Sequence, residues 1–445
     1  MTLTDEQIKN AKEEIGTQLQ EILDKQAKTD LKNKQSEIKK ILEEEKNITR
    51  NDVYETIGKW LYLTDTNHID LELATAISID SPDPPLWILI LAASGDSKTT
   101  TSTGLDHAPR VILIDQITPN YLASGMKDAH DLGEKLQHST HLLLIPDLAC
   151  FSTLKTDDKK LIWGQFRTLY DGYITKGTGN NVCKKYEGCH VGLIGCGVPS
   201  FKNEQIVKDQ LGTRELIYML PPVEKNENLT KVRKALTHRN LKEQMEQEIR
   251  NVMQGILRVK KFNPDIVTPP YIQEYIEKKI FELALFRASA QIDYYTGELF
   301  GSVDQEVPTR VAQQFDLLYR SLHSLDEDYP DEKFYEIIEN MVNSSSVPLR
   351  KEIYDYMNKL QNEADKQGRM FPIRKNANEL SKHFNKSRKA VKIQCLVLVE
   401  LGVFDVEYEM EVAGRGSFEQ EVAYFSLKEK QQKLTGTQQD LVTCT

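Results

Sequence analysis

The stretch from Ala92 to Thr99 has the residue types of a phosphate-binding loop. It follows the apolar run LWILIL and ends in Lys98 and Thr99, which match the end of the pattern G-x-x-x-x-G-K-[ST]. In such a loop, backbone N–H groups and the start of the next helix attract phosphate, the lysine reaches the outer phosphates, and the threonine hydroxyl binds Mg²⁺. We expect the following residues to bind ATP: Ser94, Gly95, Asp96, Ser97, Lys98, Thr99 and Thr100.

The loop departs from that pattern at both of its glycine positions. Ala92 and Ser97 stand there, and Gly95 is the only glycine of the stretch. A side chain at position 97 narrows the room for a phosphate close to the backbone. Taken by itself, the stretch also fits a plain turn between a strand and a helix.

Asp147 is the second residue that favours a nucleotide site. It ends the apolar stretch HLLLIPD, where ATPases of this class place the acid that positions Mg²⁺. We expect the strand before it and the strand before the loop to lie side by side, with Asp147 close to Thr99. The alternative is a structural carboxylate that closes a strand.

The residue after Asp147 argues for binding more than for hydrolysis. Many such enzymes have a glutamate there, which polarises the attacking water, and this chain has Leu148. A base would then have to come from another acidic residue, with three candidates: Asp115, Asp157 and Asp158. Without one, hydrolysis would be slow.

These residues need a sheet to position them, and the sequence predicts one. Short apolar runs at 86–92, 110–115, 141–147, 190–196 and 216–221 are separated by helical or loop stretches. Nearly continuous apolar strands joined by helices are typical of a mostly parallel sheet covered on both faces. We therefore expect an α/β core, followed by a helical region from 226 to about 325.

Several of these stretches together resemble AAA+ P-loop ATPases, in particular the helicase-like branch that includes the minichromosome-maintenance helicases. PPLWILILAASGDSKTT is similar to their Walker A segment, and HLLLIPD to Walker B. The stretches QITPNYLASG, RTLYDGYITKGTG and HVGLIGCGVPSF resemble uncharacterised ATPases of phages and integrated elements. The resemblance covers about residues 55–325 and continues into the C-terminal segment.

The resemblance also implies roles for two arginines. Arg214 in GTRELIYMLP stands where such ATPases have an arginine finger, which reaches the γ-phosphate of a neighbouring subunit. Arg310 in VPTRVAQQF stands where they have the sensor 2 arginine, and Ser200 is a candidate sensor 1 residue. Either arginine could instead be an ordinary surface residue. An arginine finger acting in trans implies a homo-oligomeric ring, commonly a hexamer.

The segment 347–428 has the order of a winged helix-turn-helix. NELSKHF would be the first helix of the pair, RKAVKIQCLVLVELG the second, and the strands around AGRGSF the wing. The basic start of the second helix suits the major groove of DNA, with Arg388 or Gln394 able to reach bases. Expected DNA-facing residues are Asn385, Lys386, Ser387, Arg388, Lys389, Lys392 and Arg415. A winged helix that binds protein is the alternative.

The composition limits the surface charge and the class of protein that we expect. The 445 residues carry a formal net charge of −10, which excludes a uniformly basic surface but not a basic patch. Neither a signal peptide nor a membrane span is evident, so we expect a cytoplasmic protein that does not enter a membrane. The cluster Cys183, Cys189 and His190 lacks the spacing of a zinc site, and we assign no metal to it.

The chain divides into five expected parts. They are a helical N-terminal region (1–55), a P-loop core (56–225), a helical lid (226–330), a winged helix-turn-helix domain (331–428) and a disordered tail (429–445). The N-terminal helices fit a packing surface for a partner or a solvated arm.

Three functions fit this organisation. The first is an ATP-binding, DNA-associated motor or remodeller, such as a helicase or replication initiator of a mobile genetic element. The second is a nucleotide-gated DNA-binding regulator with little or no ATP hydrolysis. The third is a structural adaptor in which both sites have lost their ligands.

Overall fold

The computed structural model describes most of the chain. The described residues are 48–95, 97–126, 130–177, 183–203, 214–288, 290, 299, 303, 308–369, 371–413 and 418–428. The expectations for the N-terminal helices before residue 48 and for the tail from 429 onward lie outside this range, as do those for Asp96 and Arg415.

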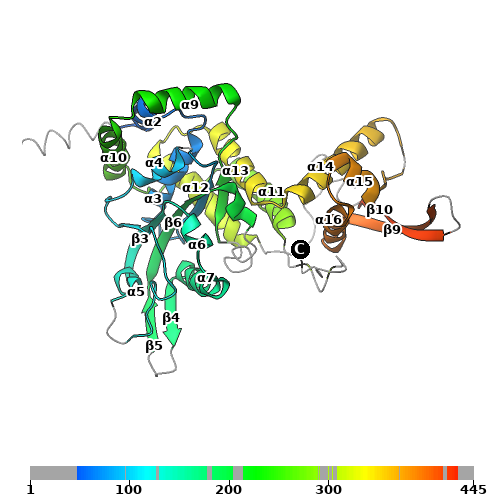
Figure 1. Ribbon diagram of the computed structural model, residues 1–445, viewed down its shortest axis with the longest axis horizontal. Helices are drawn as coiled ribbons and strands as arrows, with labels where there is room; N and C mark the ends of the chain where they lie inside the picture. The colour runs from blue at the N-terminus through cyan, green and yellow to red at the C-terminus, as the bar shows by residue number, and fades with distance from the viewer. Residues whose placement is uncertain are drawn as a thin grey trace, which may run out of the picture.

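The core is built on a parallel sheet of five strands (Figure 1). The strands are β1 (Trp87–Leu91), β2 (Val111–Leu113), β3 (Ser139–Ile145), β6 (Cys189–Gly197) and β7 (Leu216–Met219). Their order is β2-β3-β6-β1-β7, and all neighbouring pairs are parallel. The prediction of a mostly parallel α/β sheet is confirmed.

The expected neighbour of β1 was wrong. We expected β3 beside it, but β6 pairs with both strands and separates them. Strand pairing joins residues far apart in the sequence, so an apolar run shows that a strand forms and not which strand it pairs with. Because all strands are parallel, the ends of β1 and β3 still reach the same edge of the sheet.

Alternate residues of β1 face two separate layers of helices. Ile88 and Ile90 pack toward α3 (Asn67–Ser78), while Trp87 and Leu89 pack on the opposite face. The first layer also contains α2 (Arg50–Trp60), α4 (Lys98–Thr103), α10 (Lys242–Val259) and α12 (Thr309–Leu325). The second contains α5 (Leu132–Leu136), α6 (Ala149–Ser152) and α7 (Thr156–Tyr170). Burial on both faces explains why the strands are apolar throughout.

An antiparallel ribbon projects from this core. Strands β4 (Tyr173–Gly177) and β5 (Cys183–Glu187) follow α7 and precede β6 in the sequence. They extend away from the sheet (Figure 1). Lys184 Nζ lies 2.9 Å from Asp131 Oδ2 and ties the ribbon to the loop before α5. After β6 the chain forms the 3₁₀ turn η1 (Pro199–Asn203).

The core continues with helices after β7, and the last of these covers the edge of the sheet at β7. They are α9 (Lys225–Thr237), α10, α11 (Pro270–Arg287), α12 and α13 (Asp331–Ser345). Asn340 on α13 accepts a hydrogen bond from Met219 N at 3.1 Å and donates one to Met219 O at 2.8 Å. This side chain satisfies the outer backbone groups of β7, which an edge strand would otherwise expose.

Helix α13 therefore belongs to the core, which corrects the boundary that we placed at residue 331. Its buried residues Phe334, Ile338 and Met341 join the cluster around α3 and α12. Helical periodicity marks a buried face but does not identify the core into which that face packs. The first predicted boundary, at residue 55, likewise falls inside α2.

The C-terminal module has an apolar core of its own. Its elements are α14 (Pro348–Lys366), β8 (Lys375–Asn376), α15 (Ala377–Phe384), α16 (Arg388–Glu400), β9 (Phe404–Ala413) and β10 (Phe418–Leu427). The strands form an antiparallel sheet in the order β8-β10-β9. Ile353, Leu380, Val391, Phe404 and Phe425 are buried between this sheet and the three helices.

Arg350 joins the module to the core. Its side chain is only 3% exposed, and burial lowers its pKa to about 10. Nη1 donates to the carbonyls that end α11, including Ala288 O at 2.8 Å, while Nε donates to Gln394 Oε1 at 3.1 Å. The last carbonyls of a helix have no partner within the helix, and this guanidinium supplies one.

Within the part of the chain that the structure describes, none of the helices combines the length and the apolar character needed to cross a membrane.

We expect Arg350→Met to loosen the module without disturbing the core sheet. The methionine fills the volume but leaves buried carbonyls of α11 without a donor, which should cost about 2 to 4 kcal/mol. Hydrogen exchange should then become faster in α14 and α16 and stay unchanged in β1 and β6. The exposed residue Arg369 gives the control, Arg369→Met. Equal protection of α16 in both variants would contradict this role.

Candidate functional site

The loop after β1 lies at the carboxyl edge of the sheet. Ala92 N donates to Gly197 O at 3.0 Å, which ties the start of the loop to the end of β6. Gly95 has φ +82°, a left-handed conformation that a residue with a side chain adopts at a cost. The single glycine that the loop retains therefore stands where the backbone requires it.

Lys98 and Thr99 converge with the end of β3. Lys98 is 6% exposed and its Nζ donates to Ala93 O at 3.2 Å, so its side chain folds back along the loop. Thr99 Oγ1 donates to Pro146 O at 3.4 Å, directly before Asp147. The exposed Asp147 carboxylate accepts from Ala149 N at 2.9 Å. The three residues expected to hold Mg-ATP thus meet at one edge of the sheet.

The pKa of the Cys196 thiol gives further evidence that Lys98 and Asp147 lie close together. It lies near the end of β6, with Sγ 3.9 Å from Lys98 O. Burial and the Glu72 carboxyl raise its pKa to about 12, while Lys98 acts to lower the pKa and Asp147 to raise it. Both charged residues therefore lie close enough to act on one buried group between them.

Glu72 supports the helix that carries the loop. It lies on α3, is completely buried, and Oε1 accepts from Thr101 Oγ1 of α4 at 3.0 Å. Burial raises its pKa well above the usual carboxyl value, which favours the protonated, neutral form. A neutral acid adds no negative charge beneath the loop.

Leu148 points away from this site. The side chain is completely buried in the cluster on the α7 face of the sheet. A Cβ at Gly195 or Gly197 would come within 3.1 Å of Leu148 Cδ1 or Cδ2, so these two glycines make room for the leucine. The residue that replaces the expected glutamate therefore has a packing role.

Of the candidate bases, Asp115 acts on the same thiol as Asp147, that of Cys150. Burial raises the pKa of the Cys150 thiol to about 11, and Asp147 and Asp115 both add to the shift. Asp157 and Asp158 lie in the first turn of α7. Ser200 is exposed in η1, just beyond the end of β6.

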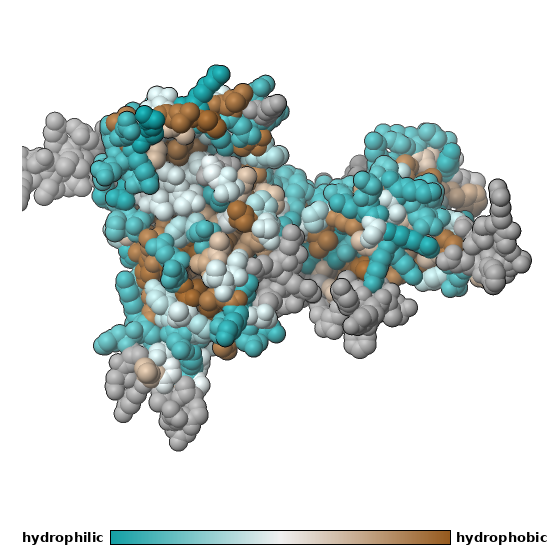
Figure 2. All heavy atoms as spheres, viewed as in Figure 1, coloured by the Kyte–Doolittle hydropathy of each residue, from teal (hydrophilic) through white to brown (hydrophobic). Residues whose placement is uncertain are grey.

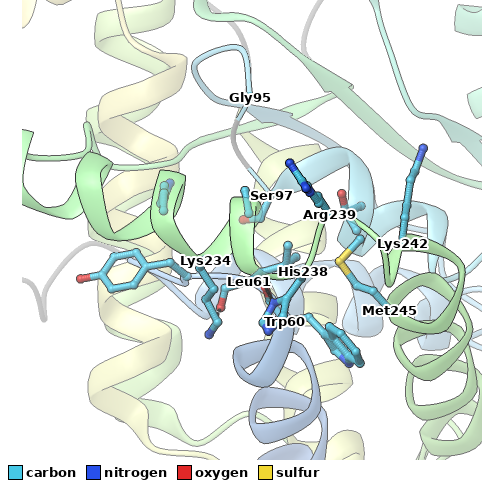
Figure 3. Close-up of a pocket in the computed structure, with 13 residues that line it drawn as sticks. Trp60, Leu61, Gly95, Ser97, Lys234, His238, Arg239, Lys242 and Met245 are labelled. Carbon is cyan, nitrogen blue, oxygen red and sulfur yellow. Dashed lines mark hydrogen bonds between the residues drawn. The ribbon is translucent and has the colours of Figure 1, made fainter.

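A cavity of about 300 Å³ adjoins the loop (Figure 3). Gly95, Ser97 and Thr100 form one side, and the end of α2 with the α9–α10 connection forms the rest. Its basic lining residues are Lys231, Lys234, His238, Arg239 and Lys242. The volume is at the lower end of the range for small-molecule sites, and the charge suits an anion.

The walls of this cavity are tied to one another. Lys234 Nζ donates to the backbone carbonyls of Leu61, at 3.0 Å, and of Gly58 at the end of α2. Burial lowers the pKa of Lys234. The rings of Trp60 and His238 meet edge to face at 5.0 Å. Sequence reasoning missed this site, although the run KVRKALTHRNLK at 231–242 was a visible signal of local positive charge.

Arg214 and Arg310 lie together at the opposite edge of the sheet. Their guanidinium carbons are 5.8 and 5.9 Å from the ring centre of Tyr170, and Arg214 Nη2 lies 2.6 Å from Asp171 Oδ2. The residue after Glu215 is Leu216, which pairs with Ile88 at the start of β1, so this is the amino edge. The structure brings the two arginines to each other and not to Lys98 of the same chain.

The start of α16 forms a basic, exposed surface. Asn385, Lys386, Ser387, Arg388, Lys389 and Lys392 are all exposed. Ser387 also caps α16, since its hydroxyl accepts from Ala390 N at 3.2 Å. Asn385 has φ 52°, which allows the tight turn between α15 and α16.

Gln394 does not join that surface, contrary to our expectation that it could reach a base. Its carbonyl oxygen accepts from Arg350 Nε at 3.1 Å, toward the interior of the module. Position along the helix suggested a polar side chain near DNA, but the partner that holds it comes from α14.

The residues at the carboxyl edge have the donor chemistry of a magnesium site. A threonine hydroxyl, a carboxylate and phosphate oxygens are the hard ligands that Mg²⁺ takes, with water completing the shell. Among the described residues, no group of three His, Cys, Asp or Glu side chains could hold a metal by itself. Bound phosphate would have to share in the ligation.

We expect Leu148→Glu to destabilise the core by roughly 3 to 5 kcal/mol, because it buries a carboxyl among apolar side chains. Burial would raise the pKa of the new carboxyl, so the loss should grow as pH rises from the ordinary carboxyl value toward the raised one. Urea unfolding at several pH values measures this, with Leu148→Met as control. A fully stable variant with faster ATP hydrolysis would show that the side chain turns toward the nucleotide.

Comparison with known proteins adds no relative: no protein-family model matches the sequence, and a search of curated proteins returns no match. What the chain does must be inferred from its own residues.

Proposed function

We propose that this chain binds ATP and Mg²⁺ at the carboxyl edge of the sheet and uses the nucleotide in work on DNA. The contact from Thr99 Oγ1 to Pro146 O carries the proposal, because it brings the loop to the strand end that presents Asp147. Lys98 would turn from Ala93 O to the outer phosphates. Thr99 and Asp147 would hold Mg²⁺, and the adjoining basic cavity would take a further part of the nucleotide.

The order of elements in the C-terminal module supports a winged helix-turn-helix. Helix α16 would be the recognition helix, with β9 and β10 as the wing. Its exposed basic start has the character of a surface that neutralises phosphates, with Lys386, Lys389 and Lys392 as the phosphate contacts and Arg388 as the base reader. The acidic protein thus offers one local basic face to DNA.

The position of the two arginines supports assembly. Arg214 and Arg310 cannot reach the loop of their own chain from the amino edge, so a role on phosphate would have to be played in a neighbouring subunit. Arg214 is 8% exposed and pairs with Asp171, so it would have to leave that carboxylate to do so. A homo-oligomeric ring, such as a hexamer, would supply that neighbour. With the AAA+ resemblance, this favours a helicase, motor or replication initiator of a mobile element.

One observation favours a second candidate, a nucleotide-gated DNA-binding regulator. Leu148 is buried on the far face of the sheet, so the usual water-polarising carboxylate is absent from that position. Binding requires only the loop, Lys98 and the magnesium ligands. Phosphate release measured with and without DNA distinguishes the two candidates.

We expect Lys98→Ala to abolish ATP binding while leaving DNA binding by the full chain intact. The lysine is the one side chain of the loop that can place a positive charge on the outer phosphates. Titration calorimetry with Mg-ATP and a fluorescent DNA duplex measures both. Lys160→Ala, at an exposed position of α7, is the matched control. Unchanged ATP affinity in Lys98→Ala would rule out this nucleotide site.

We expect Lys392→Ala to weaken DNA binding about equally for different sequences. Loss of one phosphate contact should also reduce the slope of log affinity against log salt by about 1. Lys359→Ala, an exposed lysine of α14, serves as the control for charge alone. If both variants change DNA affinity equally, the basic start of α16 has no special part in binding.

A further inference from the structure

Helix α9 presents an apolar face to solvent. Leu229, Val232 and Leu236 lie at helical spacing on one side of the helix, and each is more than half exposed. Figure 2 shows hydrophobic surface along the top of the molecule, where Figure 1 places α9. A row of large apolar side chains on one face marks an interaction surface.

Strong positive charge surrounds this face. Residues 224–242 contain six basic and two acidic side chains. Arg233 is exposed beside Val232, and Arg239 is exposed just beyond the helix. The partner for this surface should therefore be apolar at its centre and acidic around it.

The β9–β10 hairpin has that character. Tyr408 and Met410 follow Phe404 and Val406 on one face of β9, but unlike those two they extend past the module core and are 57% and 60% exposed. Glu421 of β10 is exposed directly opposite Met410.

The hairpin is acidic as well as apolar. Residues 404–427 contain six acidic residues and one basic residue, Arg415. Glu407 and Glu409 contact Arg374 on the other face of β9, while Glu421 lies on the same face as Met410. A hairpin of this charge is repelled by DNA phosphates, so its exposed face suits a basic protein surface better than a nucleic acid.

The two surfaces cannot meet within one chain. In Figure 1, α9 crosses the top of the nucleotide-binding core, and the hairpin projects from the far end of the C-terminal module. A second copy of the chain supplies the missing partner for each surface.

We propose that the β9–β10 hairpin of one copy docks on the apolar face of α9 of a second copy. Tyr408 and Met410 would pack against Leu229, Val232 and Leu236. Glu421, on the same face as Met410, would lie near Arg233 and its basic neighbours. The contact uses no nucleotide, so it stands independently of the proposed ATP site.

This interface joins two different surfaces, so in a dimer one copy keeps its α9 face unused and the other keeps its hairpin unused. Such head-to-tail contacts form a ring where the rotation between copies closes, and a filament where it does not. The hairpin would then act as a connector between subunits, while α16 stays available for DNA.

Sedimentation velocity of the full chain, without nucleotide or DNA, tests the docking. The wild type should associate as its concentration rises, and Leu236→Ser and Met410→Ser should each shift it toward the monomer. An equimolar mixture of these two variants should form a dimer, since one variant retains α9 and the other the hairpin. Circular dichroism checks that each variant is folded.

Charge reversal provides the second measurement. Arg233→Glu and Glu421→Lys should each weaken association, and the two changes combined should restore part of it. Glu363→Lys, at an exposed position of α14, is the control for net charge. Arg233 and Glu421 need not touch for this result, because the complementarity belongs to the whole surfaces.

Four outcomes would overturn the proposal. The wild type could remain a monomer at every concentration, or the mixture could fail to dimerise. Association could also appear only after deletion of residues 1–47, which would show that the N-terminal segment covers α9. A DNA duplex that protects α9 from hydrogen exchange, with no mass increase in the free protein, would assign that helix to nucleic acid instead.

Discussion

The parallel pairing of β1 with β6 and β7 is the constraint on which the rest of the structure depends. Because every strand of the sheet runs in one direction, all carboxyl ends lie at one edge and all amino ends at the other. The loop with Lys98 and the end of β3 with Asp147 meet at the first edge although β6 lies between their strands. Binding at the carboxyl edge is the general behaviour of such sheets.

The same pairing sends Arg214 and Arg310 to the other edge. If the Lys98 loop binds phosphate as proposed, the chain carries an anion site at one edge and two arginines at the opposite edge. The α9 face and the acidic hairpin form a second complementary pair, again at separate places on the chain. Within one copy the two members of each pair lie apart, and head-to-tail packing of identical copies would bring them together.

The sequence predicted what depends on local pattern. Apolar runs located all five strands of the core sheet, and the spacing of Lys98, Thr99 and Asp147 identified residues that the fold does bring together. It failed where distant segments decide the outcome. Three features depend on contacts between residues far apart in the chain. They are the position of β6 between β1 and β3, the packing of α13 on β7 and the hydrogen bond from Arg350 to Gln394.

The cavity was missed for the same reason. Its walls come from the end of α2, the loop and the α9–α10 connection, which are separated by up to half the sequence, and only the basic run at 231–242 hinted at it. Leu148 shows a different limit. The sequence shows that a leucine stands where a glutamate was expected. It does not show that the side chain is buried on the face away from the loop, where two glycines of β6 make room for it.

These features bear on what a bound nucleotide could do. The cavity is lined by α2, α9 and α10 as well as by the loop. Lys234 and the Trp60–His238 contact already hold α2 near the α9–α10 connection. A ligand in the cavity would therefore contact these helices and the loop at the same time. A ligand shifts a conformational equilibrium only by the difference in its affinity for the two states. Without a carboxylate at position 148, ATP could serve as a clamp on α2, α9 and α10 for as long as it stays bound. Release of that clamp would then depend on how effectively Asp115 or another acid activates water, or on a neighbouring copy that brings its arginines to the phosphates.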